Sequence, residues 1–229
     1  MRESKLNPHQ AKQPPRIKMC GLSREQDITC VSTLLPDFVG FVFASSPRQV
    51  SITQAAHLKS LLDSRIKAVG VFVGESVDEI VELVDSGVID YIQLHDSSEI
   101  ESSENFTRRE SRILALRQRT SAPIIKAITA SNVPNILAQQ ESTADLLLLD
   151  NAKGGSGKCF DWDYVVRARE AGFDREFFLA GGINAGNLSR ALALHPYGID
   201  LSKGLESNGA KDCAKMHEIM EILRDNLTH

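Results

Sequence analysis

The chain has 229 residues, 42% of them hydrophobic, and its formal net charge at pH 7 is −4. Acidic and basic residues are mixed along the chain, which argues against a nucleic-acid-binding protein. No apolar run approaches the roughly 18 residues that a membrane-spanning helix needs, and the N-terminus lacks the apolar core of a secretion signal. The sequence therefore predicts a cytoplasmic protein that contacts neither membrane nor nucleic acid.

Cysteine and histidine are too scattered to indicate a metal centre. The four cysteines, Cys20, Cys30, Cys159 and Cys213, form no Cys-x-x-Cys pair, and the six histidines form no metal-binding motif. Because the chain lacks a secretion signal, all four thiols are predicted to be reduced.

The predicted elements alternate along nearly the whole chain. Residues 1–16 are polar and contain three prolines, so they are predicted to form a flexible N-terminal extension. Short apolar runs predict strands over 17–21, 38–43, 67–73, 91–95, 124–128, 144–150, 177–181 and 198–202. Helices are predicted between and after them, near 24–34, 53–64, 76–85, 98–119, 132–141, 163–171, 186–194 and 211–227. Eight strands alternating with helices predict an α/β fold, a (β/α)8 TIM barrel of one catalytic domain over residues 17–229.

Two of the predicted helices carry start signals. Ser23, with Gln26 three residues later, is expected to cap the first helix. Ser76 precedes Asp78 and Glu79, whose negative charges suit the first turn of the third helix.

Asp150 ends the most apolar of the predicted strands. It follows four consecutive leucines and precedes a glycine-rich loop at 153–158. TIM barrels place their chemistry at the carboxyl ends of strands, and apolar surroundings there raise the pKa of a carboxyl group, which suits a general acid. The alternatives are a cap on the following loop and an ion pair with a barrel lysine, for which Lys126 is the candidate.

Cys20 ends the first predicted strand, and Lys18 shares its face two residues earlier. A neighbouring ammonium group favours the thiolate, which would make Cys20 a better base. The alternative is a small buried thiol that fills a gap in the core, with Lys18 paired to an acid inside the barrel. A thiol and a carboxyl group at strand ends of one barrel suggest a proton-transfer pair.

Small residues follow the last two predicted strands. Gly181 and Gly182 follow the seventh strand, and Ser202 and Lys203 follow the eighth. Barrels frequently bind phosphate between these two loops, where small side chains let backbone N–H groups come close to the ligand. These four residues are therefore predicted to bind a phosphate group, although glycines there could also serve only to turn the chain.

Three further side chains have less specific surroundings. Arg48 follows the second strand, and its planar guanidinium suits an anionic substrate group, a carboxylate above all. A solvated arginine is the alternative. His95 at the end of the fourth strand is expected to be a core histidine, and Trp162 is expected to be a packing anchor.

In this order, the motifs resemble the phosphoribosylanthranilate isomerase family of tryptophan biosynthesis. The resemblance covers nearly everything after residue 16, and it begins with Lys18-Met19-Cys20-Gly21-Leu22. The other matching motifs are Gly40-Phe41-Val42-Phe43, Ser46-Pro47-Arg48, Val69-Gly70-Val71-Phe72-Val73, Gln93-Leu94-His95, Leu148-Leu149-Asp150, Gly154-Gly155-Ser156-Gly157-Lys158, Phe160-Asp161-Trp162, Leu179-Ala180-Gly181-Gly182-Ile183, Gly204-Leu205-Glu206, Gly209 and Lys211-Asp212. The chain departs from the family pattern at Asp96 and Lys203.

The resemblance implies an isomerase that needs no cofactor and no metal. Its reaction converts N-(5-phosphoribosyl)anthranilate to 1-(2-carboxyphenylamino)-1-deoxyribulose 5-phosphate by an Amadori rearrangement. The resemblance makes Asp150 the general acid for the furanose ring oxygen and Cys20 the base that takes the C2′ proton. It places Arg48 at the anthranilate end, and the phosphate at Gly181, Gly182, Ser202 and Lys203. The partner is then a small phosphorylated molecule, bound by a monomer or a homodimer.

Three other functions remain open at this point. A Schiff-base aldolase on the same barrel would use Lys126 as its nucleophile. A degenerate barrel would only bind a phosphorylated metabolite. An isomerase of wider specificity would also act on an aminoaldose of the histidine pathway.

Overall fold

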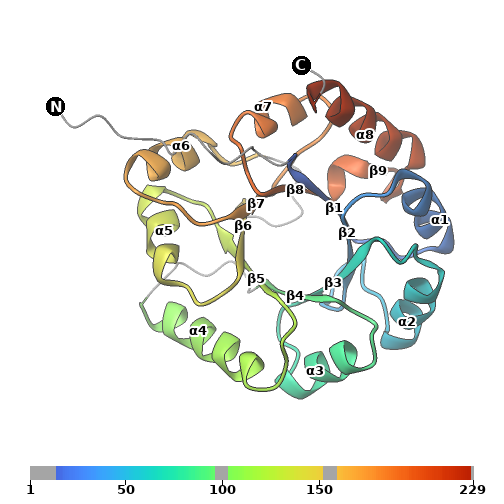
Figure 1. Ribbon diagram of the computed structural model, residues 1–229, viewed down its shortest axis with the longest axis horizontal. Coiled ribbons are helices and arrows are strands. Elements are labelled where there is room, and N and C mark those ends of the chain that lie inside the picture. The colour runs from blue at the N-terminus through green and yellow to red at the C-terminus, as the bar shows by residue number, and fades with distance from the viewer. Residues whose placement is uncertain (1–13, 96–102, 152–158, 228–229) are drawn as a thin grey trace.

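A computed structural model describes residues 14–95, 103–151 and 159–227, which form a closed barrel of eight parallel strands surrounded by helices (Figure 1). The strands follow one another in chain order, and β8 pairs with β1 to close the ring. They are β1 (Arg16–Cys20), β2 (Phe38–Val42), β3 (Lys67–Phe72), β4 (Tyr91–His95), β5 (Ile124–Thr129), β6 (Leu146–Asp150), β7 (Phe177–Leu179) and β8 (Gly198–Leu201). The predicted TIM barrel is confirmed.

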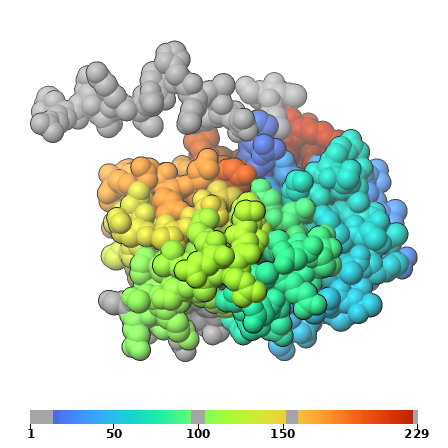
Figure 2. Space-filling view, turned by 60° about the horizontal axis from the view of Figure 1, so that its bottom comes forward, coloured from blue at the N-terminus to red at the C-terminus, as the bar shows by residue number. Residues whose placement is uncertain are grey.

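The helices lie outside the ring of strands, where Figure 2 shows the cyan to yellow part of the chain forming one outer wall. They are α1 (Glu25–Leu34), α2 (Ile52–Leu61), α3 (Val77–Asp85), α4 (Ser103–Arg117), α5 (Val133–Leu137), α6 (Asp163–Glu170), α7 (Leu188–Leu192) and α8 (Cys213–Leu227). Short 3-10 turns η1 (Ala138–Glu141) and η2 (Lys203–Leu205) follow α5 and β8. Across the described residues, none of these helices is both long and apolar enough to cross a membrane.

The predicted strand ends are shifted by at most two residues in the structure. The first strand already begins at Arg16, whose Nη1 donates to Asp37 Oδ1 at 2.7 Å and whose backbone N–H donates to the Tyr197 carbonyl at 2.9 Å. The last residue of the predicted extension therefore belongs to the barrel. Residues 1–13 of that extension lie outside the described part of the chain.

The predicted cap of the first helix is wrong. Arg24 and not Ser23 is the N-cap residue, and the carboxylate of Asp27 accepts from the backbone N–H groups of Ser23 and Arg24, at 3.1 and 3.0 Å. A carboxylate one turn inside the helix satisfies these N–H groups and also complements the positive end of the helix dipole. At α3 the prediction is confirmed, because Ser76 and Glu79 exchange the two hydrogen bonds of a capping box.

Side chains alternate between the inside of the barrel and the layer beneath the helices. The inside is filled by apolar side chains that include Phe38, Ile125 and Phe178, and Phe38 makes edge-to-face contact with the Phe178 ring at 5.5 Å between centroids. Their neighbours along each strand face the helices and form the larger outer core. This alternation decides which polar residues of a strand can reach the mouth of the barrel.

Lys126 faces the helices, which corrects its expected place inside the barrel. Its Nζ lies 2.9 Å from Glu110 Oε1 on α4 and 4.2 Å from the centre of the Phe106 ring. Its neighbours Ile125 and Ala127 are the ones that point inward. Lys126 is therefore neither the partner of Asp150 nor a nucleophile at the mouth of the barrel, and the aldolase alternative loses its only candidate residue.

Cys30 and Cys213 form a disulfide, so the prediction that all four cysteines are reduced is wrong. The two residues are 183 positions apart, with their Cα atoms 5.9 Å apart. Closure of the barrel brings α1 beside α8, where the blue and red ends of the chain meet in Figure 1. The bond therefore ties the first helix of the barrel to the last one.

Breaking this bond is expected to lower the free energy of unfolding by about 2–5 kcal/mol, because the bond closes a long loop in the unfolded chain. Urea unfolding of the Cys30→Ser/Cys213→Ser variant should show the loss, and addition of a dithiol reductant should then change nothing further. Equal stability of the oxidised protein and the double variant would contradict the prediction.

Candidate active site

The strands bring the predicted site residues to one end of the barrel. Cys20 is the last residue of β1, and Asp150 is the last residue of β6. Gly181 and Gly182 lie in the loop after β7, and Ser202 directly follows β8. Because all eight strands run in the same direction, their carboxyl ends form a single mouth. The exposed Lys203 and the half-buried Arg48, which follow β8 and β2, lie at the same end. The glycine-rich loop predicted at 153–158 falls outside the described residues.

A buried ion pair lies beneath this mouth. Lys18 and Asp200 are register partners on the neighbouring strands β1 and β8, and Lys18 Nζ is 2.7 Å from Asp200 Oδ1. Burial is the largest single cause and acts to lower the pKa of Lys18, but the charges of Asp200 and Cys20 and the hydrogen bonds to them together outweigh it, so the pKa is raised. Lys18 is thus a cation inside the barrel. Its pairing with an acid there is the second of the two interpretations that the sequence allowed.

Cys20 is a buried thiol with only 6% of its surface exposed. Burial raises its pKa, the positive charges of Lys18 and Lys211 oppose this, and the net pKa is above the ordinary value of a thiol. The predicted effect of Lys18 therefore has the expected sign but does not prevail. When only the protein's own charges surround it, the Cys20 thiol is therefore protonated at neutral pH.

Asp150 has the raised pKa that the apolar strand predicts. Burial is the largest cause, while the charge of His95 and the Asn151 backbone N–H, 2.7 Å from Asp150 Oδ1, act in the opposite direction. A carboxyl group that keeps its proton to higher pH is suited to general acid catalysis.

Both reactive groups interact electrostatically with the Lys18–Asp200 pair. Asp200 raises the pKa of the Cys20 thiol and of the Asp150 carboxyl group, and Lys18 lowers both. The thiol and the carboxyl group therefore share one electrostatic environment at the mouth.

His95 is half-buried at the end of β4, and its charge favours the ionised form of Asp150. His95 was expected to be a core histidine, but it also interacts electrostatically with Asp150. Trp162 is buried, with the Arg190 guanidinium 5.2 Å from its ring centre, which confirms the expected packing role.

Arg48 is held by a carboxylate that the sequence did not single out as a site residue. Its Nε and Nη2 donate to Glu206 at 2.6 and 3.0 Å, and this carboxylate also accepts from Lys211 Nζ at 2.9 Å. Glu206 and Lys211 lie in motifs of the family resemblance, but their contact with Arg48 has no local signal in the sequence, since Arg48 is 158 positions from Glu206. Arg48 is therefore a fixed cation and not a freely solvated one.

The loop after β7 needs glycine at two successive positions. Gly181 and Gly182 have φ angles of 81° and 70°, a region that side-chain-bearing residues rarely adopt. The carbonyl of Gly182 accepts from the Asn184 and Asn187 side chains, both at 3.1 Å. After the neighbouring strand β8, Lys211 Nζ donates to the Ser202 carbonyl at 2.8 Å. Side chains thus fix the loops after β7 and β8.

One cluster within the described residues has three potential metal ligands, namely Cys30, Cys213 and His217. Its two sulfur atoms are joined in the disulfide, so neither is present as a thiolate. The cluster also lies on the helices α1 and α8, away from the mouth.

A closed parallel barrel with a carboxyl group, a thiol and cations at the carboxyl ends of its strands is the architecture of a TIM-barrel enzyme. Residues 17–222 match the family model described as N-(5′-phosphoribosyl)anthranilate (PRA) isomerase. The chain belongs to this family.

Individual relatives agree with the family model. An N-(5′-phosphoribosyl)anthranilate isomerase from Endomicrobium trichonymphae is 40% identical over 92% of this chain and 98% of its own. The phosphoribosyl anthranilate isomerase of Thermus thermophilus superposes with a TM-score of 0.78 at 28% identity, over 92% of this chain and 98% of its own. A third structure, with a TM-score of 0.73 at 27% identity over 92% and 99% of the two chains, is a phosphoribosyl anthranilate isomerase in complex with reduced 1-(o-carboxyphenylamino)-1-deoxyribulose 5-phosphate.

Proposed function

We propose that this protein catalyses the isomerisation of N-(5-phosphoribosyl)anthranilate to 1-(2-carboxyphenylamino)-1-deoxyribulose 5-phosphate, with Asp150 as general acid and Cys20 as general base. The reaction is a step of tryptophan biosynthesis. The observation that carries the proposal is that Asp150 and Cys20 end strands of one barrel and interact with the same buried Lys18–Asp200 pair. The ligand is a small phosphorylated molecule, and we expect the enzyme to work as a monomer or a homodimer.

Asp150 opens the sugar ring. Its carboxyl group donates a proton to the furanose ring oxygen while the bond between C1′ and this oxygen breaks. The lone pair of the anthranilate nitrogen forms the C1′=N bond of a positively charged Schiff base. The raised pKa of Asp150 keeps the proton available for this step.

Cys20 completes the proton transfer. The positive Schiff base favours the thiolate of Cys20, which overcomes the effect of burial. The thiolate then removes the C2′ proton, and the electrons of the C–H bond form a C1′=C2′ bond and neutralise the nitrogen. The resulting enol becomes the ketone of the product when C1′ takes up a proton and the C2′ hydroxyl loses its own.

The remaining residues bind the two ends of the substrate. Arg48 suits the anthranilate carboxylate, because a guanidinium edge matches a carboxylate in geometry and charge. The backbone groups at Gly181, Gly182, Ser202 and Lys203 suit the phosphate, because they lie in the loops after β7 and β8. The reacting sugar would then lie between the two ends, over Asp150 and Cys20.

A fluorescence assay that follows the loss of phosphoribosylanthranilate tests the activity directly. The purified protein should convert the substrate without any added metal or cofactor. Absence of turnover in a folded preparation with its disulfide intact would overturn the proposed function.

Substitution of Gly182 should weaken ligand binding far more than it slows the bound reaction. Gly182→Val adds a branched side chain at a φ of 70° and obstructs backbone approach to the phosphate, so product affinity should fall by about tenfold or more. Calorimetry with the product measures this loss. Gly87→Val is the matched control, since Gly87 has a φ of 72° and lies before β4 at the opposite end of the barrel. Equal product affinity in folded Gly182→Val and wild type would place the phosphate elsewhere.

A further inference from the structure

A short hairpin after β8 carries two charged residues to the mouth of the barrel. It consists of β9 (Glu206–Ser207) and β10 (Ala210–Lys211), joined by Asn208 and Gly209 at φ angles of 52° and 80°. Two successive positive φ angles are those of the tight turn that Asn-Gly favours in hairpins. This turn sets the register so that Glu206 lies opposite Lys211. The hairpin therefore holds an acid and a base side by side.

The Glu206 carboxylate accepts three hydrogen bonds from two cations. Its Oε1 accepts from Arg48 Nε at 2.6 Å and from Lys211 Nζ at 2.9 Å, and its Oε2 accepts from Arg48 Nη2 at 3.0 Å. Burial acts to raise its pKa, but the bonds from Arg48 and Lys211 lower it to about 2. With 9% of its side chain exposed, Glu206 is a half-buried partner of Arg48 that is ionised at neutral pH.

Arg48 is also held from its other side. A Cβ atom on Gly21 would lie 2.5 Å from Arg48 Cδ, so this glycine is needed for the Arg48 side chain to pass over the end of β1. The bonds to Glu206 use the Nε and Nη2 edge of the guanidinium. The second edge of the guanidinium is formed by Nη1 and the other N–H of Nη2, and among the described residues none accepts a hydrogen bond from Nη1. That edge can bind a carboxylate with two parallel hydrogen bonds.

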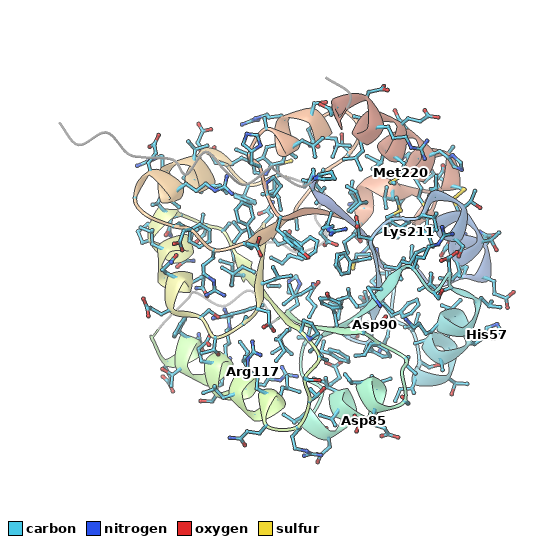
Figure 3. The ribbon with its side chains drawn as sticks, in the orientation of Figure 1. His57, Asp85, Asp90, Arg117, Lys211 and Met220 are labelled. Carbon is cyan, nitrogen blue, oxygen red and sulfur yellow. A yellow bond between two sulfur atoms is a disulfide. The ribbon has the colours of Figure 1, made fainter. Side chains whose placement is uncertain are left out.

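Lys211 connects this arrangement to the neighbouring loop and to the thiol. Its Nζ donates to the Ser202 carbonyl at 2.8 Å, and its charge favours the thiolate of Cys20. Figure 3 shows Lys211 between the strand ring and the corner where α1 and α8 meet. Arg48, Lys211 and Glu206 together carry one net positive charge, so the carboxylate orients the cations without cancelling their attraction for an anion.

We propose that Glu206 is a positioning residue, which fixes the guanidinium of Arg48 so that its Nη1/Nη2 edge binds the anthranilate carboxylate of the substrate. This inference rests on the proposed function, because it assigns the Arg48 edge to that substrate. Glu206 does not touch the reacting atoms. Its role is to hold Arg48 in one rotamer before the substrate binds, which removes the entropic cost of ordering a long side chain at that moment.

Steady-state kinetics of Glu206→Gln test the proposal. The amide keeps the size of the side chain but cannot be a charged acceptor for Arg48, so KM should rise about tenfold while kcat stays within about twofold. Inhibition by inorganic phosphate should be unchanged, because phosphate does not use the Arg48 edge. In an Arg48→Met background, Glu206→Gln should raise KM little further, because no guanidinium remains to be oriented.

Glu110→Gln is the matched control. Glu110 is also a carboxylate with little exposure, 11% of its side chain, a pKa lowered to about 2 and a buried lysine partner, but it lies on α4 and away from the mouth. This variant should keep the wild-type KM. If Glu206→Gln does not fold, Glu206→Asp replaces it, and its shorter side chain, unable to hold both nitrogens of Arg48, should also raise KM.

The possible outcomes separate this proposal from the proposed function. A wild-type protein without isomerase activity overturns the function, and the inference falls with it. If the wild type is active, the proposed function stands. The inference alone is then overturned if Glu206→Gln leaves KM unchanged, lowers KM, or lowers only kcat. Effects of Arg48→Met and Glu206→Gln that simply add would also overturn it. An increased KM with unchanged phosphate inhibition and no further increase in the double variant supports it.

Discussion

Asp150→Asn is expected to lower kcat by about 10²–10⁴-fold, the usual contribution of a general acid, with the fold intact. The amide has nearly the shape of the carboxyl group and can still accept the Asn151 backbone N–H, which lies 2.7 Å from Asp150 Oδ1 in the wild type. It cannot give a proton to the furanose ring oxygen. Stopped-flow or steady-state fluorescence of phosphoribosylanthranilate measures the loss.

The pH profile gives a second test of Asp150. Its raised pKa means that the carboxyl group gives up its proton as the pH rises through that pKa, so the Asp150-dependent part of kcat should fall in that direction. Asp150→Asn should lack this fall. Asp85→Asn is the control, since Asp85 is exposed on α3 at the outer edge of the molecule (Figure 3) and its amide should leave kcat unchanged. Near wild-type kcat in Asp150→Asn would remove Asp150 from the mechanism.

The barrel could be predicted from the sequence because each strand is a compact apolar run between turn residues. The Leu146–Asp150 strand is the clearest case, since four leucines that are buried in the structure end at a half-buried acid. Such runs fix where a strand lies but not which face each residue takes. The segment Ile124–Thr129 is apolar on both sides of Lys126, so its sequence does not show that the lysine faces the helices.

Contacts between distant parts of the chain could not be predicted in the same way. The Cys30–Cys213 disulfide joins residues 183 positions apart, and its two cysteines meet only because β8 closes on β1. The pairing of Glu206 with Arg48 also depends on this closure, since the hairpin after β8 reaches the loop after β2 across the end of β1. The candidate acid and base were predictable because each is a local feature, a reactive side chain at a strand end.

The residues that tune the site became visible only in three dimensions. Asp200 raises the pKa of both Cys20 and Asp150, and the sequence shows it only as one acid within a short strand. Asp200 is recognised as part of the site only because it is the register partner of Lys18, and register is a property of the two paired strands and not of either segment alone. The sequence therefore indicated the reactive groups, and the structure adds what sets their proton affinities.

Cys20→Ser is expected to lower kcat by about 10²–10⁴-fold with little change in product affinity, because the thiol moves a proton and does not hold the ligand. Serine is nearly isosteric with cysteine, but its hydroxyl is a far weaker acid and makes a poor proton acceptor at neutral pH. Burial already raises the pKa of the Cys20 thiol, so the wild type itself depends on the positive Schiff base to favour the thiolate.

Chemical modification of Cys20 has to be separated from that of Cys159. Cys159 is the exposed free cysteine, and its Sγ lies 3.5 Å from the Gly182 carbonyl, so an alkyl group there would crowd the loop after β7. Iodoacetamide should therefore be applied to a Cys159→Ser protein, which we expect to be fully active. In that background, iodoacetamide should modify Cys20 alone and abolish turnover, and bound product should slow the modification.

The same variants show whether the other cysteines take part in the reaction. Cys30 and Cys213 lie in the helix layer, so the Cys30→Ser/Cys213→Ser protein should lose stability but keep kcat at temperatures where it is folded. Loss of activity in this folded protein, or wild-type turnover by Cys20→Ser, would refute the assignment of Cys20 as the base. A large fall in kcat confined to Cys20→Ser, with calorimetric product affinity unchanged, leaves proton abstraction at C2′ as the step that the thiol performs.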